Sequence, residues 1–362
     1  MRVLVLNGPN LNLLGTREPE VYGDTTLEEL EALIEGWGSA LGIETVFSQS
    51  NHEGELVDAI QSADGVDGLV INPGALTHTS RSIGDAISSV GLPAIEVHIS
   101  NVRQREPWRA ISLVGPSCVR TIFGRGIGGY QDALRHLQNR AVTSFETVAY
   151  GPHPDNVGDI RRPDGEVAGL VVLIHGGLWR QEYERDSTET LAIDLTGQGY
   201  VTWNVEYRRG QQGYWPAPAH DVVSAMDFIA REVPGMPTGI VGHSAGGHLG
   251  LWAAARRADD IRLLVGLAPI TDVAAMAGAG AVGSRDAQRL LDSGAPPVVD
   301  LIEGRTLLVH GEEDEIVPVS QSTRLSTGSR IEVVTGMGHF PMLDPKREHW
   351  PLVVAELGKA LV

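Results

Sequence analysis

Two groups of residues in the chain have the types and the spacing that chemistry requires. In the first 140 residues, amides, histidines, arginines and a tyrosine follow closely on apolar segments. In the second half, a serine stands in Gly242-His243-Ser244-Ala245-Gly246, between an apolar strand-like segment and an apolar helix-like one. The first group suits a small, polyhydroxylated, anionic ligand. The second suits nucleophilic catalysis by an activated serine.

The serine segment has the pattern of a nucleophile elbow, in which small residues permit a tight turn from strand to helix. Two further predicted strands come later, and Asp314 follows the first of them while His339 follows the second. The order Ser, Asp, His predicts Ser244 as nucleophile, His339 as base and Asp314 as the residue that orients the base. The acidic residues that remain alternatives to Asp314 are Glu312, Glu313, Glu315 and Asp272.

An oxyanion hole is predicted upstream of the serine. The sequence His175-Gly176-Gly177-Leu178-Trp179 follows an apolar strand. Glycines allow backbone N–H groups to face an oxyanion, so Gly176 and Gly177 are expected to act with the N–H of Ala245. Trp179 is open to two interpretations, as part of this site or as a core aromatic residue.

In the first half, the polar residues gather where predicted strands end. Ligands of parallel α/β sheets bind outside the carboxyl ends of the strands, so these side chains are expected to converge. The segment contains neither a metal-binding cluster nor a phosphate loop. The candidate residues are Asn10, Arg17, Tyr22, Asn72, His78, Glu96, His98, Arg105 and Arg109.

The elements that position the first group alternate between strand and helix. Thr25–Leu41 is the clearest predicted helix, with a capping box between Thr26 and Glu29. Five strand–helix units predict a parallel sheet covered on both faces. The predicted strands are Arg2–Leu6, Ile43–Ser48, Gly68–Asn72, Ala94–Ile99 and Val119–Phe123.

A second series of strands is too long to extend the first sheet, so we expect two α/β domains, residues 1–140 and 145–362. The junction around Ala141–Ser144 has no Gly/Ser-rich spacer. The predicted strands of the second series are Glu146–Tyr150, Gly158–Arg161, Gly169–Ile174, Tyr200–Glu206, Gly239–Gly242, Ile261–Leu267, Arg305–His310 and Ile331–Thr335.

Composition excludes several classes of function. The 362 residues carry a net charge of -18, and both halves are acidic, which argues against nucleic-acid binding. Apolar runs are too short for a membrane-spanning helix, and Met1–Gly8 resembles a strand rather than a signal peptide. Cys118 is the single cysteine, which excludes an intrachain disulfide and fits a reducing compartment, so the cytoplasm is the expected location.

Five segments of residues 1–140 carry motifs that occur in a fixed order: Leu4–Asn12, Arg17–Gly23, Gln49–Leu56, Asn72–Ser80 and Glu96–Asn101. These motifs resemble those of type II 3-dehydroquinate dehydratases. The resemblance implies a flavodoxin-like, five-stranded parallel sheet and the trans-dehydration of 3-dehydroquinate to 3-dehydroshikimate without a cofactor or metal. Residues 110–117 and Pro107-Trp108 depart from the family's usual pattern.

The resemblance also implies roles for single residues. Tyr22 matches the base that removes a C2 proton, with Arg17 as the natural source of a nearby cation. Asn10 matches the residue that holds a water against the enolate oxygen. His98 matches the acid that protonates the departing hydroxyl, and Glu96 would orient it.

Other positions match binding and assembly residues of the family. Arg105 matches an arginine of the mobile lid, and Asp85 matches a residue that enters a neighbouring subunit's site. A homo-oligomer is implied, a dodecamer of trimers or else a trimer. The lysines, Lys346 and Lys359, lie far from this half, which excludes an imine mechanism there. The residues expected to bind substrate hydroxyls or carboxylate are Asn72, His78, Arg109, Ile99 and Ser100.

The second half resembles α/β-hydrolases of the HGG-x-W type, which include small-substrate esterases and kynurenine formamidases. The segment Trp203–Arg208 adds to that likeness. The resemblance implies an α/β-hydrolase fold and esterase or amidase activity on an unidentified small molecule. Two alternatives remain: a hydrolase half that serves only assembly, or a first half that only senses a ligand. Whether the route is biosynthetic or catabolic stays open.

Overall fold

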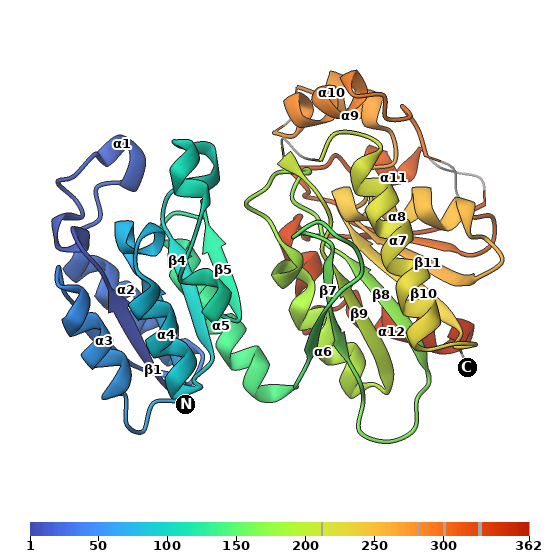
Figure 1. The fold of residues 1–362 in the computed structure, drawn as a ribbon. Helices are drawn as coiled ribbons and strands as arrows, with labels where there is room; N and C mark the ends of the chain where they lie inside the picture. Colours follow the sequence, from blue (N-terminus) through green and yellow to red (C-terminus); the bar gives the residue numbers. More distant parts are fainter. Residues whose placement is uncertain (211–212, 281, 300–301, 325–327, 362) are drawn as a thin grey trace. The chain divides into compact units, whose positions relative to one another are not determined.

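The computed structural model describes residues 1–210, 213–280, 282–299, 302–324 and 328–361. The chain divides into two compact units, Met1–Val142 and Thr143–Val362, each with its own sheet (Figure 1). The last residue of the second unit and of the predicted second domain, Val362, lies outside the described residues. No helix among the described residues is both long and apolar enough to cross a membrane.

The first unit contains a five-stranded parallel sheet in the order β2-β1-β3-β4-β5. This is the flavodoxin-like order, and it confirms the fold class predicted for this half. The strands are β1 (Arg2–Asn7), β2 (Glu44–Gln49), β3 (Gly68–Asn72), β4 (Ala94–His98) and β5 (Arg120–Phe123).

Helices cover both faces of this sheet (Figure 1). Val3 and Val5 of β1 face one layer of helices, while Leu4 and Leu6 face the other, because side chains alternate along a strand. The first layer consists of α2 (Leu27–Ala40) and α5 (Gly128–Val142), and the second of α3 (Glu53–Gln61) and α4 (Arg81–Val90).

The predicted helix start at Thr26 is confirmed. The Thr26 hydroxyl accepts the Glu29 N–H at 3.3 Å, and the Glu29 carboxylate accepts the Thr26 N–H at 2.8 Å. Two N–H groups of the first turn that lack a partner within the helix are thereby satisfied, which sets the start of α2.

The second unit contains an eight-stranded sheet in the order β13-β12-β11-β10-β8-β9-β7-β6. Neighbouring strands run parallel from β13 to β9. At the other edge β7 pairs antiparallel with both β9 and β6. This architecture confirms the predicted α/β-hydrolase fold. The strands are β6 (Glu146–Ala149), β7 (Val157–Arg161), β8 (Gly169–Ile174), β9 (Tyr200–Val205), β10 (Thr238–His243), β11 (Ile261–Leu267), β12 (Thr306–Gly311) and β13 (Arg330–Val334).

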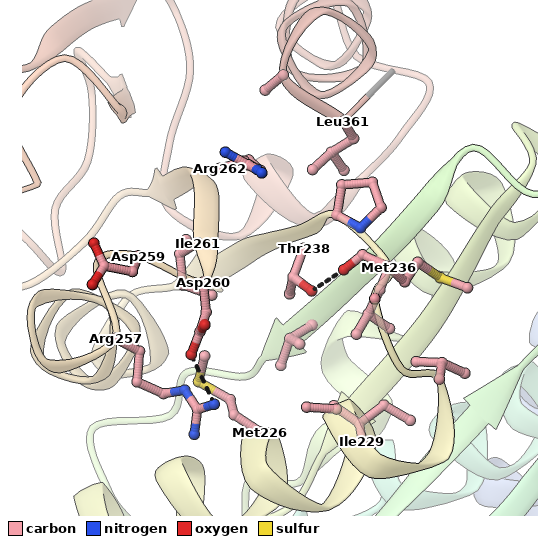
Figure 2. Close-up of a pocket in the computed structure, with 17 residues that line it drawn as sticks. Met226, Ile229, Met236, Thr238, Arg257, Asp259, Asp260, Ile261, Arg262 and Leu361 are labelled. Atoms are coloured by element: carbon pink, nitrogen blue, oxygen red, sulfur yellow. Dashed lines mark hydrogen bonds and ion pairs between the residues drawn. The ribbon is translucent and has the colours of Figure 1, made fainter.

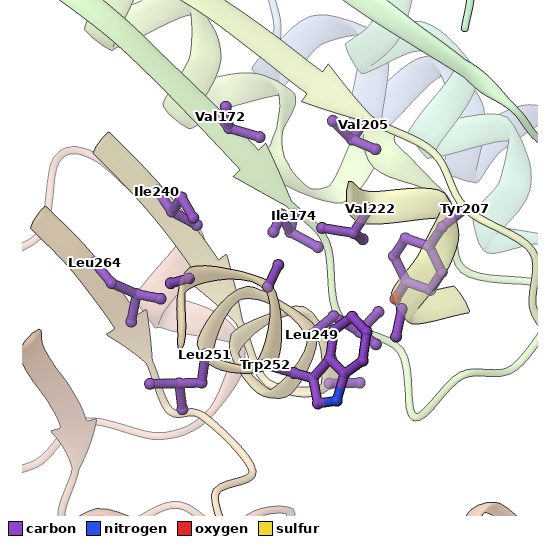
Figure 3. Packing of buried hydrophobic residues seen from close by; sticks show 14 of the residues in the cluster. Val172, Ile174, Val205, Tyr207, Val222, Ile240, Leu249, Leu251, Trp252 and Leu264 are labelled. Atoms are coloured by element: carbon purple, nitrogen blue, oxygen red, sulfur yellow. The ribbon is translucent and has the colours of Figure 1, made fainter. Parts of the chain in front are cut away.

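The core of this unit lies between the sheet and its helices. Figure 3 shows Ile174, Ile240 and Leu264 of the sheet against Leu249 and Trp252 of α8. The helices that pack on the sheet are α6 (Glu189–Gly197) and α12 (Trp350–Leu361) on one face, and α7 (Ala217–Glu232) and α8 (Ala245–Arg256) on the other. The short helices are α9 (Val273–Gly278), α10 (Ser284–Asp292) and α11 (Ser320–Thr323).

Candidate active sites

A cleft of the first unit lies beyond the ends of β1, β3 and β4. The sequence predicted this position because parallel strands direct their carboxyl ends to one edge. The structure brings ten of the candidate residues together in its lining. They are Asn10, Arg17, Tyr22, Asn72, His78, His98, Ile99, Ser100, Arg105 and Arg109.

Tyr22 ends the short helix α1 (Pro19–Tyr22) and is half-buried. Arg105 Nη1 donates a hydrogen bond to Tyr22 Oη at 2.8 Å. Arg17, the expected source of the cation, lies with its guanidinium carbon 5.4 Å from the centre of the Tyr22 ring and bonds Glu18 instead. The cation that contacts the phenol oxygen is therefore Arg105, whose side chain comes from the other wall of the cleft.

His98 and Glu96 form a buried pair at the end of β4. His98 Nε2 lies 3.0 Å from Glu96 Oε1, and Glu96 is fully buried. Burial opposes ionisation of Glu96, but hydrogen bonds from His98, Thr77 and Ser112 outweigh it and hold the pKa of Glu96 below its ordinary value. The structure thus places Glu96 in direct contact with the His98 ring.

Asn72 is held in place by a residue that the sequence did not single out. Asn72 Nδ2 donates to Tyr130 Oη at 3.0 Å, and Tyr130 donates to Asn7 Oδ1 at 2.7 Å. Tyr130 is fully buried in α5, and burial raises the pKa of its phenol, so it stays neutral. In the sequence Tyr130 resembled an ordinary core aromatic, because only the fold brings α5 beside β3.

His78 and Arg109 meet at Trp108. The His78 ring centre lies 4.9 Å from that of Trp108, and the Arg109 guanidinium lies 4.2 Å from the Trp108 ring. His78 Nδ1 lies 2.7 Å from the Ile111 carbonyl oxygen, so this nitrogen is the donor. Trp108 thus packs between two of the groups expected to bind substrate hydroxyls.

In the second unit, Ser244 stands at a strained turn between β10 and α8. Its φ of 55° is left-handed, a conformation that costs a non-glycine residue about 1–3 kcal/mol. A Cβ on Gly246 would lie 2.1 Å from the Ile174 carbonyl oxygen, and one on Gly242 would lie 2.6 Å from that of Gly246. Only glycine fits at both places, as the elbow pattern requires. Ser244 is buried, and its hydroxyl has no hydrogen-bond partner among the described residues.

Asp314 and His339 come together from the ends of β12 and β13. His339 Nδ1 lies 2.6 Å from Asp314 Oδ2, while Asp314 Oδ1 accepts the N–H groups of Ile316 and Val317 at 2.9 and 2.8 Å. Burial opposes ionisation of Asp314, but hydrogen bonds from His310 and His339 outweigh it and hold its pKa well below the ordinary range.

The alternative acid, Asp272, has a different role. Its carboxylate accepts the Ala275 N–H at 2.7 Å and caps the start of α9. The cap uses the side chain locally, in the way that Asp commonly does at a helix start. Of the two aspartates, Asp314 is the one that the structure places on His339.

The predicted oxyanion loop lies against the serine turn. A Cβ on Gly176 would lie 2.8 Å from Ser244 Cβ, and Gly177 has a φ of +106° beside Tyr183. Ala245 is the first residue of α8, where backbone N–H groups lack partners within the helix. Gly176 therefore brings its backbone closer to Ser244 than a residue with a Cβ could, while Gly177 makes room for the Tyr183 ring.

A buried ionic network supports this loop, and sequence reasoning missed its centre, Glu206. His175 Nε2 lies 2.7 Å from Glu206 Oε1, and Arg209 Nη1 donates to the same oxygen at 2.5 Å. Tyr207 donates to the His175 carbonyl oxygen at 2.9 Å. The signal was the Trp203–Arg208 segment, whose acidic residue follows a fully buried strand.

Trp179 is also buried, with its ring centre 5.6 Å from that of His248.

A second hollow of this unit lies at the other end of the sheet. Figure 2 shows apolar Met226, Ile229 and Met236 beside the charged side chains of Arg257 and Asp260. The hollow begins at Thr238, at the start of β10, whereas Ser244 follows the end of that strand about 20 Å away. This hollow is therefore separate from the serine turn.

Comparison with known proteins identifies the first unit. The family model Dehydroquinase class II matches residues 1–138. Catabolic 3-dehydroquinase 1 of Neosartorya fischeri is 53% identical over 136 residues, which are 37% of this chain and 91% of that protein. The 3-dehydroquinate dehydratase of Thermus thermophilus is 53% identical over 137 residues, 37% of this chain and 92% of that protein.

The chain belongs to the type II dehydroquinase family. The membership rests on its first unit, where the recognised motifs lie. In this type II dehydroquinase, Asp85 is exposed on α4 and lines a surface groove with Gly84, Ser88 and Pro116. The cleft lined by Tyr22 does not include it.

The second unit of this dehydroquinase matches a different family. The BD-FAE family model matches residues 159–328. The structure resembles a truncated carbohydrate esterase from gut microbiota, with a TM-score of 0.52 and 19% identity over 60% of this chain and 96% of that one. At that identity the likeness shows the fold, which is esterase-like.

Proposed function

We propose that residues 1–140 dehydrate 3-dehydroquinate to 3-dehydroshikimate and that residues 145–362 hydrolyse an ester or amide through a serine triad. The observation that carries the first activity is the cleft in which Arg105 bonds Tyr22 while His98, held from behind by the buried Glu96, lines the same space. Membership of the type II dehydroquinase family supports the choice of substrate.

In the proposed dehydration, Tyr22 acts as a phenolate that takes the C2 proton. The Arg105 guanidinium offers a positive charge and a hydrogen bond to the Tyr22 oxygen. The electrons of the broken C–H bond form an enolate, whose oxygen is bound by a water held on Asn10. His98 then gives its proton to the departing hydroxyl, which leaves as water while the double bond forms.

The remaining residues of the cleft would bind the substrate. Asn72, His78 and Arg109 are assigned to its hydroxyl groups, and the backbone N–H groups of Ile99 and Ser100 to its carboxylate. The carbonyl oxygens of Ile99 and Ser100 accept the N–H groups of Gly126 and Gly124 at 3.1 and 3.2 Å, which fixes that loop. Cations and N–H donors suit an anionic, polyhydroxylated ligand.

Ultraviolet absorbance of the conjugated enone product tests this activity. Tyr22→Phe should remove nearly all turnover and leave the circular dichroism spectrum unchanged. Borohydride added with substrate should not inactivate the enzyme, because residues 1–345 contain no lysine that could form an imine. Inactivation through a substrate adduct would overturn the mechanism. A wild type that binds the ligand without turnover would favour the sensor alternative.

In the proposed hydrolysis, Ser244 attacks the substrate carbonyl while His339 takes the serine proton. Asp314 orients His339 through the 2.6 Å contact and stabilises the imidazolium. Backbone N–H groups of Gly176, Gly177 and Ala245 would bind the oxyanion. His339 returns the proton to the leaving alcohol or amine, and water then releases the acyl group from Ser244.

A fluorophosphonate probe tests the hydrolase. The probe should label the wild type and fail to label Ser244→Ala, while short activated esters should give a burst followed by slower turnover. Absence of both labelling and esterase activity would favour the alternative in which this unit serves only assembly.

The proposed natural substrate of the hydrolase is an ester of quinate or shikimate. A fusion would then place two steps of one route on one chain. Hydrolysis of acyl-quinates should exceed that of N-formylkynurenine and of simple esters at equal concentration. Ready cleavage of unrelated substrates without cleavage of acyl-quinates would contradict this assignment.

The proposed assembly is a dodecamer built from trimers, or a trimer alone, in which Asp85 enters the neighbouring subunit's cleft. Twelve copies of the 38.7 kDa chain would weigh about 464 kDa, which light scattering distinguishes from a trimer. Asp85→Ala should weaken both dehydration and assembly while hydrolase activity survives. A fully active monomer would contradict the assignment.

A further inference from the structure

The carboxylate of Glu96 is surrounded by hydroxyl groups from three separate segments. Thr77 Oγ1, from the turn after β3, donates to Glu96 Oε1. Thr121 Oγ1, on β5, donates to Glu96 Oε2 at 3.0 Å. Ser112 Oγ, from the loop after Arg109, lies 3.1 and 3.0 Å from the two carboxylate oxygens.

The direction of these hydrogen bonds follows from Ser112. Its oxygen accepts the N–H groups of Val114 and Gly115 at 3.2 and 2.7 Å, which occupies both lone pairs. The Ser112 proton must therefore point to Glu96. Thr77 lies 2.8 Å from Ser112, which has no acceptor site left, so Thr77 also donates to Glu96.

Close packing keeps the group together. A Cβ on Gly115 would lie 2.8 Å from Glu96 Oε2 and 3.0 Å from Thr121 Oγ1, so the loop reaches this place only with glycine. The titratable groups that face Glu96 are His98 on its own strand and Cys118 before β5. Burial and the nearby charge of Glu96 raise the pKa of the Cys118 thiol, which stays neutral.

We propose that Thr77, Ser112 and Thr121 are positioning residues that set how tightly the Glu96–His98 pair holds its shared proton, and thereby make His98 acidic enough for dehydration. This inference rests on the proposed dehydration. Each hydroxyl stabilises the ionised carboxylate and so weakens its attraction for the proton. Because Glu96 and His98 are coupled, the proton belongs to the pair, and removing a donor raises the proton affinity of the pair as a whole.

Thr121→Val and Thr77→Val test the proposal, since valine keeps the shape of threonine and lacks the hydroxyl. Thr45→Val on β2 is the matched control, because the Thr45 hydroxyl is buried without a partner among the described residues. The alkaline limb of kcat for dehydration should move up by about one pH unit in each test variant. The neutral-pH kcat should fall roughly three- to tenfold, because the proton is held more tightly.

Rescue and a second readout separate this role from a structural one. Thr121→Ser should restore most of the wild-type profile, because it restores the hydroxyl. In the intact chain without substrate, NMR titration should show the same upward shift for the His98 ring, identified by its absence in His98→Asn. Unchanged titration and pH profile in both valine variants, with only the stability altered, would overturn the proposal.

The NMR readout also keeps this proposal distinct from the proposed activity. A wild type that fails to dehydrate 3-dehydroquinate, with His98 still shifted in both valine variants, would overturn the activity while supporting control of the proton. Normal dehydration by the wild type, with no shift of the His98 titration in either valine variant, would support the activity and overturn this proposal. A fall in kcat with an unmoved His98 titration would also overturn the proposal.

Discussion

Each unit of the chain contains a buried carboxylate paired with a histidine, and the two pairs are built differently. Glu96 and His98 lie two residues apart on one strand, so they share a face of the sheet. Asp314 and His339 follow different strands and meet only when β12 and β13 pair. The first pair is local in the sequence, and the second depends on the sheet.

The remaining donors of the two carboxylates differ as well. Side-chain hydroxyls surround Glu96, whereas backbone N–H groups of the following turn bind Asp314. Backbone donors persist whatever the side chains of Ile316 and Val317 are. The proton affinity of the Glu96 pair can therefore be changed by substituting any of three hydroxyl residues, while that of the Asp314 pair depends on the His310 side chain and on two backbone donors that substitution leaves in place.

The largest expected effect abolishes the activity of one unit and leaves that of the other unchanged. Ser244→Ala should lower esterase kcat on the order of a million-fold, because it removes the nucleophile. Dehydration should be unchanged, since Ser244 lies in the other unit. Parallel assays of both activities on one preparation check this result. Retained esterase activity would show that the triad is assigned to the wrong serine.

The two acid–histidine pairs should respond unequally to loss of their charge. Asp314→Asn should lower esterase kcat about 10⁴-fold, because the amide disfavours the required tautomer and the imidazolium of His339. Glu96→Gln should lower dehydration kcat by a smaller factor, about 10²-fold, because the amide oxygen still accepts hydrogen bonds from the hydroxyls on its side of the group. Equal losses would mean that the hydroxyls contribute nothing to position.

The two arginines near Tyr22 should also differ. Arg105→Gln should lower dehydration kcat roughly 100-fold, because it removes the cation hydrogen-bonded to the phenol oxygen. Arg17→Gln should lower it less, since the Arg17 guanidinium contacts the ring and Glu18. Steady-state kinetics on the two variants, with a stability measurement for each, test the order. A larger loss of kcat in Arg17→Gln than in Arg105→Gln would mean that Arg17 supplies the cation for Tyr22.

The network beneath the oxyanion loop should couple stability to hydrolysis. Glu206→Gln removes the buried carboxylate that lies closest to Arg209, although Glu184 and Asp155 remain near it, and this should lower the free energy of unfolding of the second unit by about 3 kcal/mol. Thermal unfolding of the variant measures this change. Esterase activity should fall with it, whereas dehydration should stay at the wild-type rate. An unaltered transition would contradict the structural role assigned to Glu206.

Acid should destabilise the second unit through His248. Burial lowers the pKa of His248 to about 4 from 6.5, so the folded unit keeps this ring neutral while the unfolded chain binds a proton below pH 6.5. As the pH falls from 6.5 to 4, the free energy of unfolding should decrease by about 3 kcal/mol from this group. Urea titrations across this range measure the loss.

His248→Gln should flatten the dependence of the free energy of unfolding on pH. His220→Gln, at an exposed position on α7, should leave this dependence unchanged. An identical pH slope in His248→Gln and wild type would contradict the assignment. Other buried groups of the unit, such as His243 and Glu206, also respond to acid, so His248→Gln should remove only part of the pH dependence.

Much of the molecule followed from local patterns. Alternating strands and helices predicted both sheets, because the period of apolar residues depends on neighbours in the chain. Glu96 and His98 were predicted as a pair from the resemblance to type II dehydroquinases, and their spacing of two on one strand places them on the same face. The strict need for glycine around Ser244 was visible as a motif, since the turn is made of consecutive residues.

The sequence by itself determined the fold class, the family of the first unit and the segments that carry both candidate sites. Only the tertiary structure decided that Arg105 rather than Arg17 bonds Tyr22, across 83 residues of chain, and that Asp314 rather than Asp272 meets His339. It also decided that Ser112 and Thr121 surround Glu96. The physical reason is the same in each case: these contacts join separate loops and strands, and their partners are set by strand order and packing, on which spacing along the chain carries no information.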